Sequence, residues 1–168
     1  LPRLRMEKRT AYAEAARVRQ IQLVHRHWHE RIELHAAPVF EAVQHFQTPP
    51  PLLRERARLT ELAIRDMLRA PLLDRPEIKT AAWDARKAGA TVLLLDDRSE
   101  RDSSTVGRKS DGRDAGAALE RLVPLVLERL NFAGTDKVTI RILPPGRKYF
   151  ATITTDSTGI TRVPFPEV

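Results

Sequence analysis

The first part of the chain carries apolar residues at the spacing of a coiled coil. Between Glu7 and Gln47 there is no glycine, and Pro38 is the only proline. Intervals of three and four residues alternate along one seam of this stretch, which comprises Val18, Ile21, His25, Trp28, Ile32, His35, Val39, Ala42 and Phe46. A seam of this heptad type predicts one long helix that needs a partner helix along a narrow stripe.

A proline-rich loop separates this helix from a second one. The Thr-Pro-Pro-Pro run at 48–51 ends the first pattern, because proline lacks an N–H group and disfavours helical angles in the residue before it. The same alternation then resumes at Leu53, Ala57, Thr60, Ile64 and Met67. Two helices joined by so short a loop predict a long antiparallel helical hairpin in a domain that spans residues 1–72.

Apolar residues outside the two seams indicate a second copy of the chain. Six such residues would stay uncovered in a single hairpin: Leu34, Phe40 and Val43 on the first helix, and Leu59, Leu62 and Leu68 on the second. We therefore expect a homodimer in which two hairpins form a four-helix bundle. Packing of the hairpin against the C-terminal half of the same chain is the alternative.

The second half of the chain changes period and predicts a small α+β domain over residues 73–168. Its expected elements are, in order, a helix at 76–88, a strand at 91–95, a polar loop at 97–113, a helix at 114–132 and a hairpin of strands at 137–143 and 148–154. Gly89 is placed to cap the C-terminus of the first helix, and Asp114 is placed to cap the N-terminus of the second. Such elements form a helical layer against a sheet.

Composition narrows the choice of partners and location. The chain carries 29 Lys and Arg against 22 Asp and Glu, and it has no cysteine, which excludes disulfides and thiolate metal sites. No apolar run approaches the roughly 18 to 20 residues that a membrane-spanning helix needs. The basic start, with Arg3, Arg5, Lys8 and Arg9, fits either a solvated helix end or the inner side of a preceding membrane segment. We expect a cytoplasmic location, alone or as the cytoplasmic part of a membrane protein.

Histidines on the first helix are the candidates for chemistry. His35 is either a polar residue that sets the register of a seam or a phosphate acceptor, since neutral imidazole has a nucleophilic nitrogen near pH 7. His25 and His29 lie four residues apart, a spacing that lets two imidazoles share a metal ion, and Glu33 continues their face. A solvated face explains these three residues better than a metal site does, and we expect no metal.

Carboxylates also end the strand predicted at 91–95. Asp96 and Asp97 precede Arg98 at the start of the polar loop. They could form a carboxylate site, but capping and solvation of the strand end are the favoured interpretation.

The order of elements resembles the sensor histidine kinases of the nitrate-sensor type. The resemblance rests on a long helix with Glu33-Leu34-His35, a proline-rich loop, a second helix, and then a helix, a strand, a helix and a hairpin. It implies that His35 is the phosphoacceptor and that residues 73–168 adopt the ATPase fold of these kinases. It also implies a response regulator as the partner.

Departures from the family's motifs argue against the kinase reaction in this chain. Ala36 stands where the family has an acidic residue beside the phosphoacceptor, and Arg129 stands near the position of its metal-binding Asn. In the family's Asp-x-Gly-x-Gly box only Gly159 keeps its place, with Asp156 one position off. Arginine cannot ligate Mg²⁺, which takes oxygen ligands. The nucleotide site marked by Arg129, Asp156 and Gly159 is therefore degenerate, and the short remainder after Gly159 cannot build an ATP lid.

These observations together predict a homodimeric cytoplasmic signalling module without a resident cofactor. It would relay a conformational change to a response regulator or another signalling protein, with little or no ATP-dependent autophosphorylation. One alternative is an active histidine kinase that uses ATP and Mg²⁺ to phosphorylate His35. The other is a basic nucleic-acid-binding regulatory module, which is less favoured because the aromatic residues do not interleave with the basic ones.

Overall fold

A computed structural model describes residues 30, 32–34, 36–98 and 115–166. The chain divides into two compact units, Leu1–Thr60 and Glu61–Val168. The boundary falls inside a helix, α2, which spans Pro51–Arg69. Each unit is described by itself.

The first unit contributes a helical segment and the start of α2. Residues 36–44 are helical, and the following residues up to Pro50 form a turn and a loop. The backbone carbonyl of Pro50 accepts hydrogen bonds from the amides of Leu53 and Arg54, each at 3.0 Å. Pro51 thus occupies the first position of α2, where the missing N–H group of proline costs nothing and its fixed φ suits a helix.

The expected long antiparallel hairpin and its four-helix bundle are wrong. The described helices α2, α3 and α5 are 19, 12 and 17 residues long, and none forms such a hairpin. Phe46, the last residue of the predicted first seam, lies beyond the helix and is 48% exposed. The spacing of the second seam is confirmed, because all five of its positions on α2 are buried or half-buried.

The physical reason for this correction is that an apolar stripe does not specify what covers it. The second half of α2 belongs to the α+β unit, where Met67 is 4% exposed. Ala70 and Leu73 follow directly and are members of the core of that unit. An apolar stripe is stabilised by any surface that removes it from water, so heptad spacing alone does not require a second long helix.

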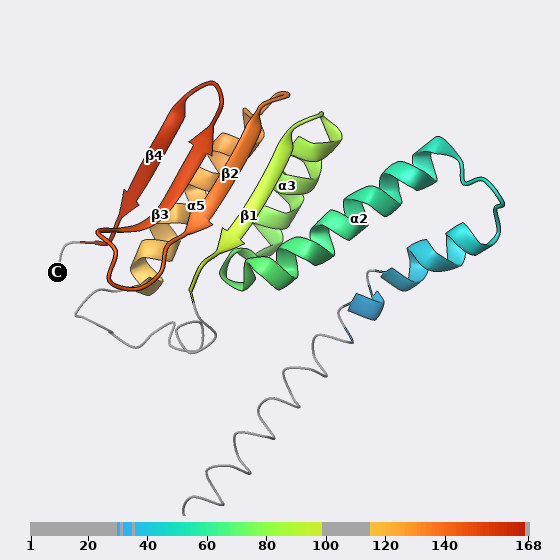
Figure 1. The fold of residues 1–168 in the computed structure, drawn as a ribbon, viewed down its shortest axis with the longest axis horizontal. Helices are drawn as coiled ribbons and strands as arrows, with labels where there is room; N and C mark the ends of the chain where they lie inside the picture. The colour runs from blue at the N-terminus through green and yellow to red at the C-terminus, as the bar shows by residue number, and fades with distance from the viewer. Residues whose placement is uncertain (1–29, 31, 35, 99–114, 167–168) are drawn as a thin grey trace, which may run out of the picture. The chain divides into compact units, whose positions relative to one another are not determined.

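The second unit is a two-layer α+β structure. The short helix η1 (Pro71–Leu73) leads to α3 (Pro76–Lys87), and α5 covers Ala115–Asn131. The strands are β1 (Thr91–Asp96), β2 (Lys137–Ile142), β3 (Tyr149–Thr155) and β4 (Gly159–Pro164). They form one sheet in the order β1-β2-β3-β4, and α3 and α5 both lie on one of its faces (Figure 1).

The connections of the sheet follow from the sequence pattern. β1 and β2 are parallel and are joined through α5, whereas β2 pairs with β3, and β3 with β4, as antiparallel neighbours. The predicted helix at 76–88, the strand at 91–95, the helix at 114–132 and the hairpin are confirmed within a few residues. β4 was missed, because its residues had been assigned to a nucleotide-binding box and the short remainder after it.

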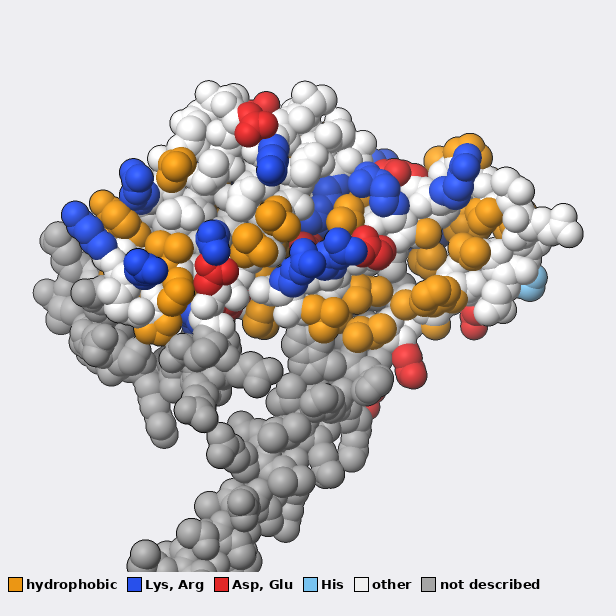
Figure 2. Space-filling view, in the orientation of Figure 1, with side chains coloured by type: hydrophobic (Ala, Val, Ile, Leu, Met, Phe, Trp, Pro, Cys, Tyr) orange, Lys and Arg blue, Asp and Glu red, His pale blue; other side chains and the backbone are white. Residues whose placement is uncertain are grey.

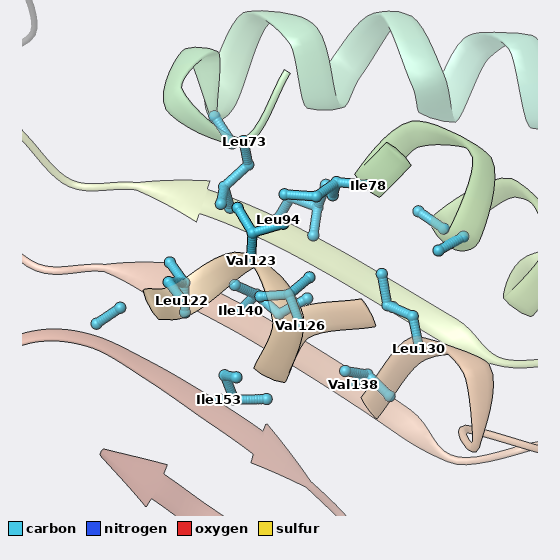
Figure 3. Packing of buried hydrophobic residues seen from close by; sticks show 14 of the residues in the cluster. Leu73, Ile78, Leu94, Leu122, Val123, Val126, Leu130, Val138, Ile140 and Ile153 are labelled. Carbon is cyan, nitrogen blue, oxygen red and sulfur yellow. The ribbon is translucent and has the colours of Figure 1, made fainter. Parts of the chain in front are cut away.

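The core lies between the sheet and the two helices. Alternate side chains of the strands, such as Val138 and Ile140 on β2, point toward α5 and are fully buried (Figure 3). Leu122, Val126 and Leu130 of α5 meet them at helical spacing. Burial of each such side chain contributes roughly 1.5–3 kcal/mol, so this layer supplies much of the stability of the unit.

Hydropathy of the described helices gives one further finding. None of the helices within the described ranges is long and apolar enough to cross a membrane.

Candidate functional site

The histidines proposed for chemistry fall outside the described residues. This applies to the candidate phosphoacceptor His35 and to His25 and His29. Ala36 is described, and it is helical and 7% exposed. Its methyl group cannot act as the base that the sensor kinases resembled by the sequence place next to their phosphoacceptor.

The three positions that the sequence resemblance assigns to a degenerate nucleotide site share one end of the α+β unit. Arg129 is in the last turn of α5, and β2 begins shortly after this helix. Thr155, at the end of β3, pairs with Val138 near the start of β2, so the turn that contains Asp156 lies at the same end. Within the described residues, no hydrogen bond or ion pair joins Arg129 to Asp156.

The turn between β3 and β4 uses its polar groups to close on itself. Thr155 pairs with Gly159 across the hairpin, and the Thr155 hydroxyl oxygen accepts a hydrogen bond from the amide of Thr158 at 3.2 Å. The two hydroxyl groups of Thr155 and Thr158 also contact each other. Gly159 has a φ of 75°, a left-handed conformation that favours glycine. A hairpin turn therefore accounts for Gly159 without a nucleotide.

The residues at this end of the unit provide a cation rather than a set of metal ligands. Arg129 is a cation, and Asp156 is exposed at the tip of the turn. Across the parts of the chain that the structure describes, no three His, Asp or Glu side chains are grouped so that they could hold a metal ion.

A second cluster lies at the carboxyl end of β1. The Asp96 side chain is 1% exposed and accepts two hydrogen bonds from the guanidinium of Arg98, at 2.9 and 2.8 Å. The same carboxylate accepts the backbone amide of Arg98 at 3.1 Å. Asp97 pairs with Arg141 of the neighbouring strand β2.

The ion pairs of Asp96 and Asp97 limit the chemistry that this cluster can perform. Carboxyl ends of parallel strands are common ligand sites in α/β proteins. Here each of the two carboxylates already binds a guanidinium, so neither is a free general base. The arrangement of Asp96 agrees with the capping role favoured from the sequence, whereas the pairing of Asp97 with Arg141 joins residues 44 positions apart and was not foreseen.

A buried ion pair joins three elements of the α+β unit. Arg86 on α3 is 4% exposed and donates to an Asp66 carboxylate oxygen on α2 at 2.6 Å. Its other terminal nitrogen donates to the backbone carbonyl of Val92, in the edge strand β1, at 2.8 Å. The guanidinium therefore links α2, α3 and β1. We call these three residues the Arg86 link.

Burial dominates the electrostatics of the Arg86 link. It raises the pKa of Asp66 above its usual value, and this effect outweighs the lowering by the charge and hydrogen bond of Arg86. The Nε atom of Arg86 is buried and has no hydrogen-bond partner among the described atoms. The link is thus a costly, directional contact, and removal of either charge would leave the other buried without its partner.

Sequence reasoning missed the Arg86 link, although a signal was present. Ile78, Ala82 and Arg86 follow one another at intervals of four residues, so the arginine stands on the apolar stripe of α3. A charged residue on an apolar stripe needs a buried partner. The sequence does not say which of the many acidic residues that partner is.

Comparison with known proteins adds no relative. The chain matches no protein-family model, no curated protein sequence and no solved structure.

Proposed function

We propose that this chain is a homodimeric signalling module that transmits a conformational change and does not depend on phosphoryl transfer. The observation that carries the proposal is the course of α2, which contains the boundary between the two compact units. A helix shared by two units gives a direct route by which a change in one reaches the other. Packed elements have discrete arrangements, so a small bias at one end can select between them.

The Arg86 link supports the same mechanism at the receiving end. A displacement or rotation of α2 moves Asp66, and Arg86 passes that movement to α3 and to the edge strand β1. Because the contact is buried and directional, it responds to a shift of α2 more sharply than an apolar contact does. A relay requires two discrete arrangements of these packed elements, and an input must favour one of them over the other.

Self-association is supported by the exposed apolar side chains of the first unit. Among the described residues of this unit, four large hydrophobic side chains are exposed, namely Leu34 at 72%, Phe40 at 65%, Phe46 at 48% and Leu52 at 86%. A second copy that covers these side chains would remove them from water. We propose this dimer without a long four-helix bundle.

Several positions argue against phosphoryl transfer as the output. Phosphoryl transfer depends on positioned charge and metal, and Arg129 supplies no oxygen ligand for Mg²⁺. Asp156 stands in the turn of a hairpin. The resemblance to sensor kinases thus supports the signalling role and not the kinase reaction.

Coupling can be tested with one introduced thiol. Because the chain has no cysteine, Leu52→Cys gives a single reactive group on α2, which a bismaleimide can cross-link to a second copy. We expect the cross-link to change hydrogen exchange in α3 and β1 by at least about threefold. The double variant Asp66→Leu/Arg86→Met on the same background removes the polar link and should abolish that change.

A cross-link at a position outside α2 serves as the control for this experiment. Phe132→Cys places the thiol on an 85% exposed residue of the α+β unit instead. It should cross-link two copies without the response that depends on Asp66 and Arg86. Equal exchange in the Leu52→Cys protein before and after cross-linking would refute the coupling.

The dimer is tested by sedimentation at tens of micromolar chain. We expect a dimer for the unmodified chain, a monomer for Leu34→Ser/Phe40→Ser, and an unchanged dimer for Phe132→Ser, which alters an exposed side chain of the other unit. A monomeric unmodified chain contradicts this part of the proposal.

The active kinase remains the rival function, and labelled ATP separates the two. Incubation with ATP and Mg²⁺ should leave the chain unlabelled if it works by conformational coupling. Acid-labile label that disappears in His35→Gln would instead establish the kinase.

A further inference from the structure

One face of the sheet is not covered by α3 or α5. Side chains alternate between the two faces of each strand, so the residues next to the buried ones point away from the helices. We call this surface the open face. It comprises Leu93, Leu95, Thr139, Arg141, Thr152, Thr154, Ile160 and Arg162. Figure 2 shows this side of the strands, where Lys and Arg side chains stand among hydrophobic ones and few acidic side chains.

The cations of the open face form an ordered row. Arg141 on β2 is directly opposite Thr152 on β3, and Thr152 is directly opposite Arg162 on β4. Opposite residues of antiparallel strands have Cβ atoms about 5 Å apart. Arg141, Thr152 and Arg162 are therefore neighbouring positions across three strands.

Two of the cations on this side lie against the ring of Tyr149. Lys148 Nζ lies 5.5 Å and the Arg162 guanidinium carbon 5.9 Å from the centroid of the Tyr149 ring. In the described ranges, neither has an acidic group within ion-pair distance, whereas Arg141 pairs with Asp97. Tyr149 thus holds two like charges near each other through cation–π contacts.

This concentration of charge does not reflect the composition of the unit. Residues 61–168 contain 18 Lys and Arg against 16 Asp and Glu. A nearly balanced sequence that gathers unpaired cations on one face presents a local positive potential, which attracts an anionic partner.

We propose that the open face binds a single-stranded nucleic acid. Its phosphates would lie along Arg162 and Lys148, with Thr152 beside Arg162 on the neighbouring strand. Arginine, lysine, threonine and tyrosine are the side chains that commonly contact phosphate and sugar. Leu95 on β1 and Ile160 on β4, which is 55% exposed, provide apolar contacts for base faces that only an unpaired strand exposes.

The centre of the face favours nucleic acid over an acidic protein. The cores of protein interfaces are depleted of charged residues and enriched in aromatic ones. Here the middle strands β2 and β3 carry threonines and Arg141, and the apolar residues stand at the two edges. This inference does not rest on the proposed signalling role.

Fluorescence anisotropy with a labelled oligothymidylate of about 20 nucleotides tests the proposal on the full chain. We expect Lys148→Gln/Arg162→Gln to weaken binding at low salt by about tenfold. Loss of two phosphate contacts should also lower the slope of log Kd against log salt by about 1.4, because each contact releases about 0.7 of a counterion from a single strand.

The control variant carries the same change of charge elsewhere. Lys87→Gln/Arg121→Gln removes two exposed cations of α3 and α5 and should alter binding by less than about twofold. Equal losses in both variants would mean attraction by total charge and would overturn the proposal. Displacement of the oligonucleotide by polyglutamate as readily as by unlabelled strand would assign the face to an acidic protein and would also overturn it.

Folding of the variants is checked independently. Lys148 and Arg162 are exposed, so both variants should keep the thermal unfolding midpoint of the unmodified chain. The single substitution Arg162→Gln provides a second measurement, and it should weaken binding in the same direction by a smaller factor. No loss in either open-face variant refutes the site.

Discussion

The two faces of the sheet are made by the same strands and yet are held by different forces. Along β2, Val138 and Ile140 are fully buried under α5, while the intervening Thr139 and the following Arg141 belong to the open face. The covered face is apolar and supplies burial energy. The open face carries hydroxyl groups and cations that add little to folding. Stability and recognition are therefore separated by a single residue step along a strand.

Neighbouring residues of β2 give the sharpest way to test this separation. Ile140→Ala removes fully buried methyl groups and should lower the free energy of unfolding by roughly 2–5 kcal/mol. Thr139→Ala, one position earlier, should cost about 1 kcal/mol or less. Urea denaturation of the two variants measures both values. Similar losses would show that the open face is also covered in solution.

Variants of the Arg86 link test whether the α+β unit tolerates a buried charge that has lost its partner. Asp66→Ala leaves the Arg86 guanidinium buried without its carboxylate and should cost about 3 kcal/mol. Asp66→Leu/Arg86→Met replaces the pair by apolar side chains and should stay within about 1 kcal/mol of the unmodified chain. Unfolding in urea again provides the measurement. If the double variant is less stable than Asp66→Ala, the ion pair itself stabilises the unit.

The hairpin turn between β3 and β4 belongs to neither face and should respond to backbone conformation alone. Gly159→Ala forces a methyl group onto a residue with a φ of 75° and should cost about 1 kcal/mol, although nothing lies within 4 Å of the added carbon. Gly159→Asn should cost less, because asparagine tolerates this conformation better. Thermal unfolding compares the two variants. Equal stability of all three proteins would point to a different turn.

The smallest expected effect is the pH dependence of the Arg86 link. Because burial raises the pKa of Asp66 in the folded state above its ordinary value of 3.8, the folded chain binds this proton more tightly than the unfolded chain does. The contribution of Asp66 to stability is therefore fully present below pH 3.8 and is lost as the pH rises through its folded pKa. Asp66→Asn should lack this decline in urea unfolding at a series of pH values.

A direct titration gives the control for that prediction. Carbon-detected NMR of the Asp66 carboxyl should give a midpoint above 3.8. A midpoint below this value would mean that the attraction of Arg86 outweighs burial, and stability would then rise with pH over the same range.

Local pattern was enough to predict most elements of the α+β unit. Proline at the start of α3, Gly89 after it, and the alternation of apolar and polar residues in β2 and β3 act within a few residues, so the sequence alone contains them. The same holds for the stripe on α2 from Leu53 to Met67, whose spacing is that of a helix with one covered side.

What covers each stripe was decided only by the tertiary structure. Hydrophobic burial has no direction and no preferred partner, so the heptad spacing of α2 could not specify what its apolar side meets. The pairings of Asp66 with Arg86 and of Asp97 with Arg141 likewise bring together residues 20 and 44 positions apart. Periodicity specifies which side of an element avoids water, and only the folded chain specifies what it meets there.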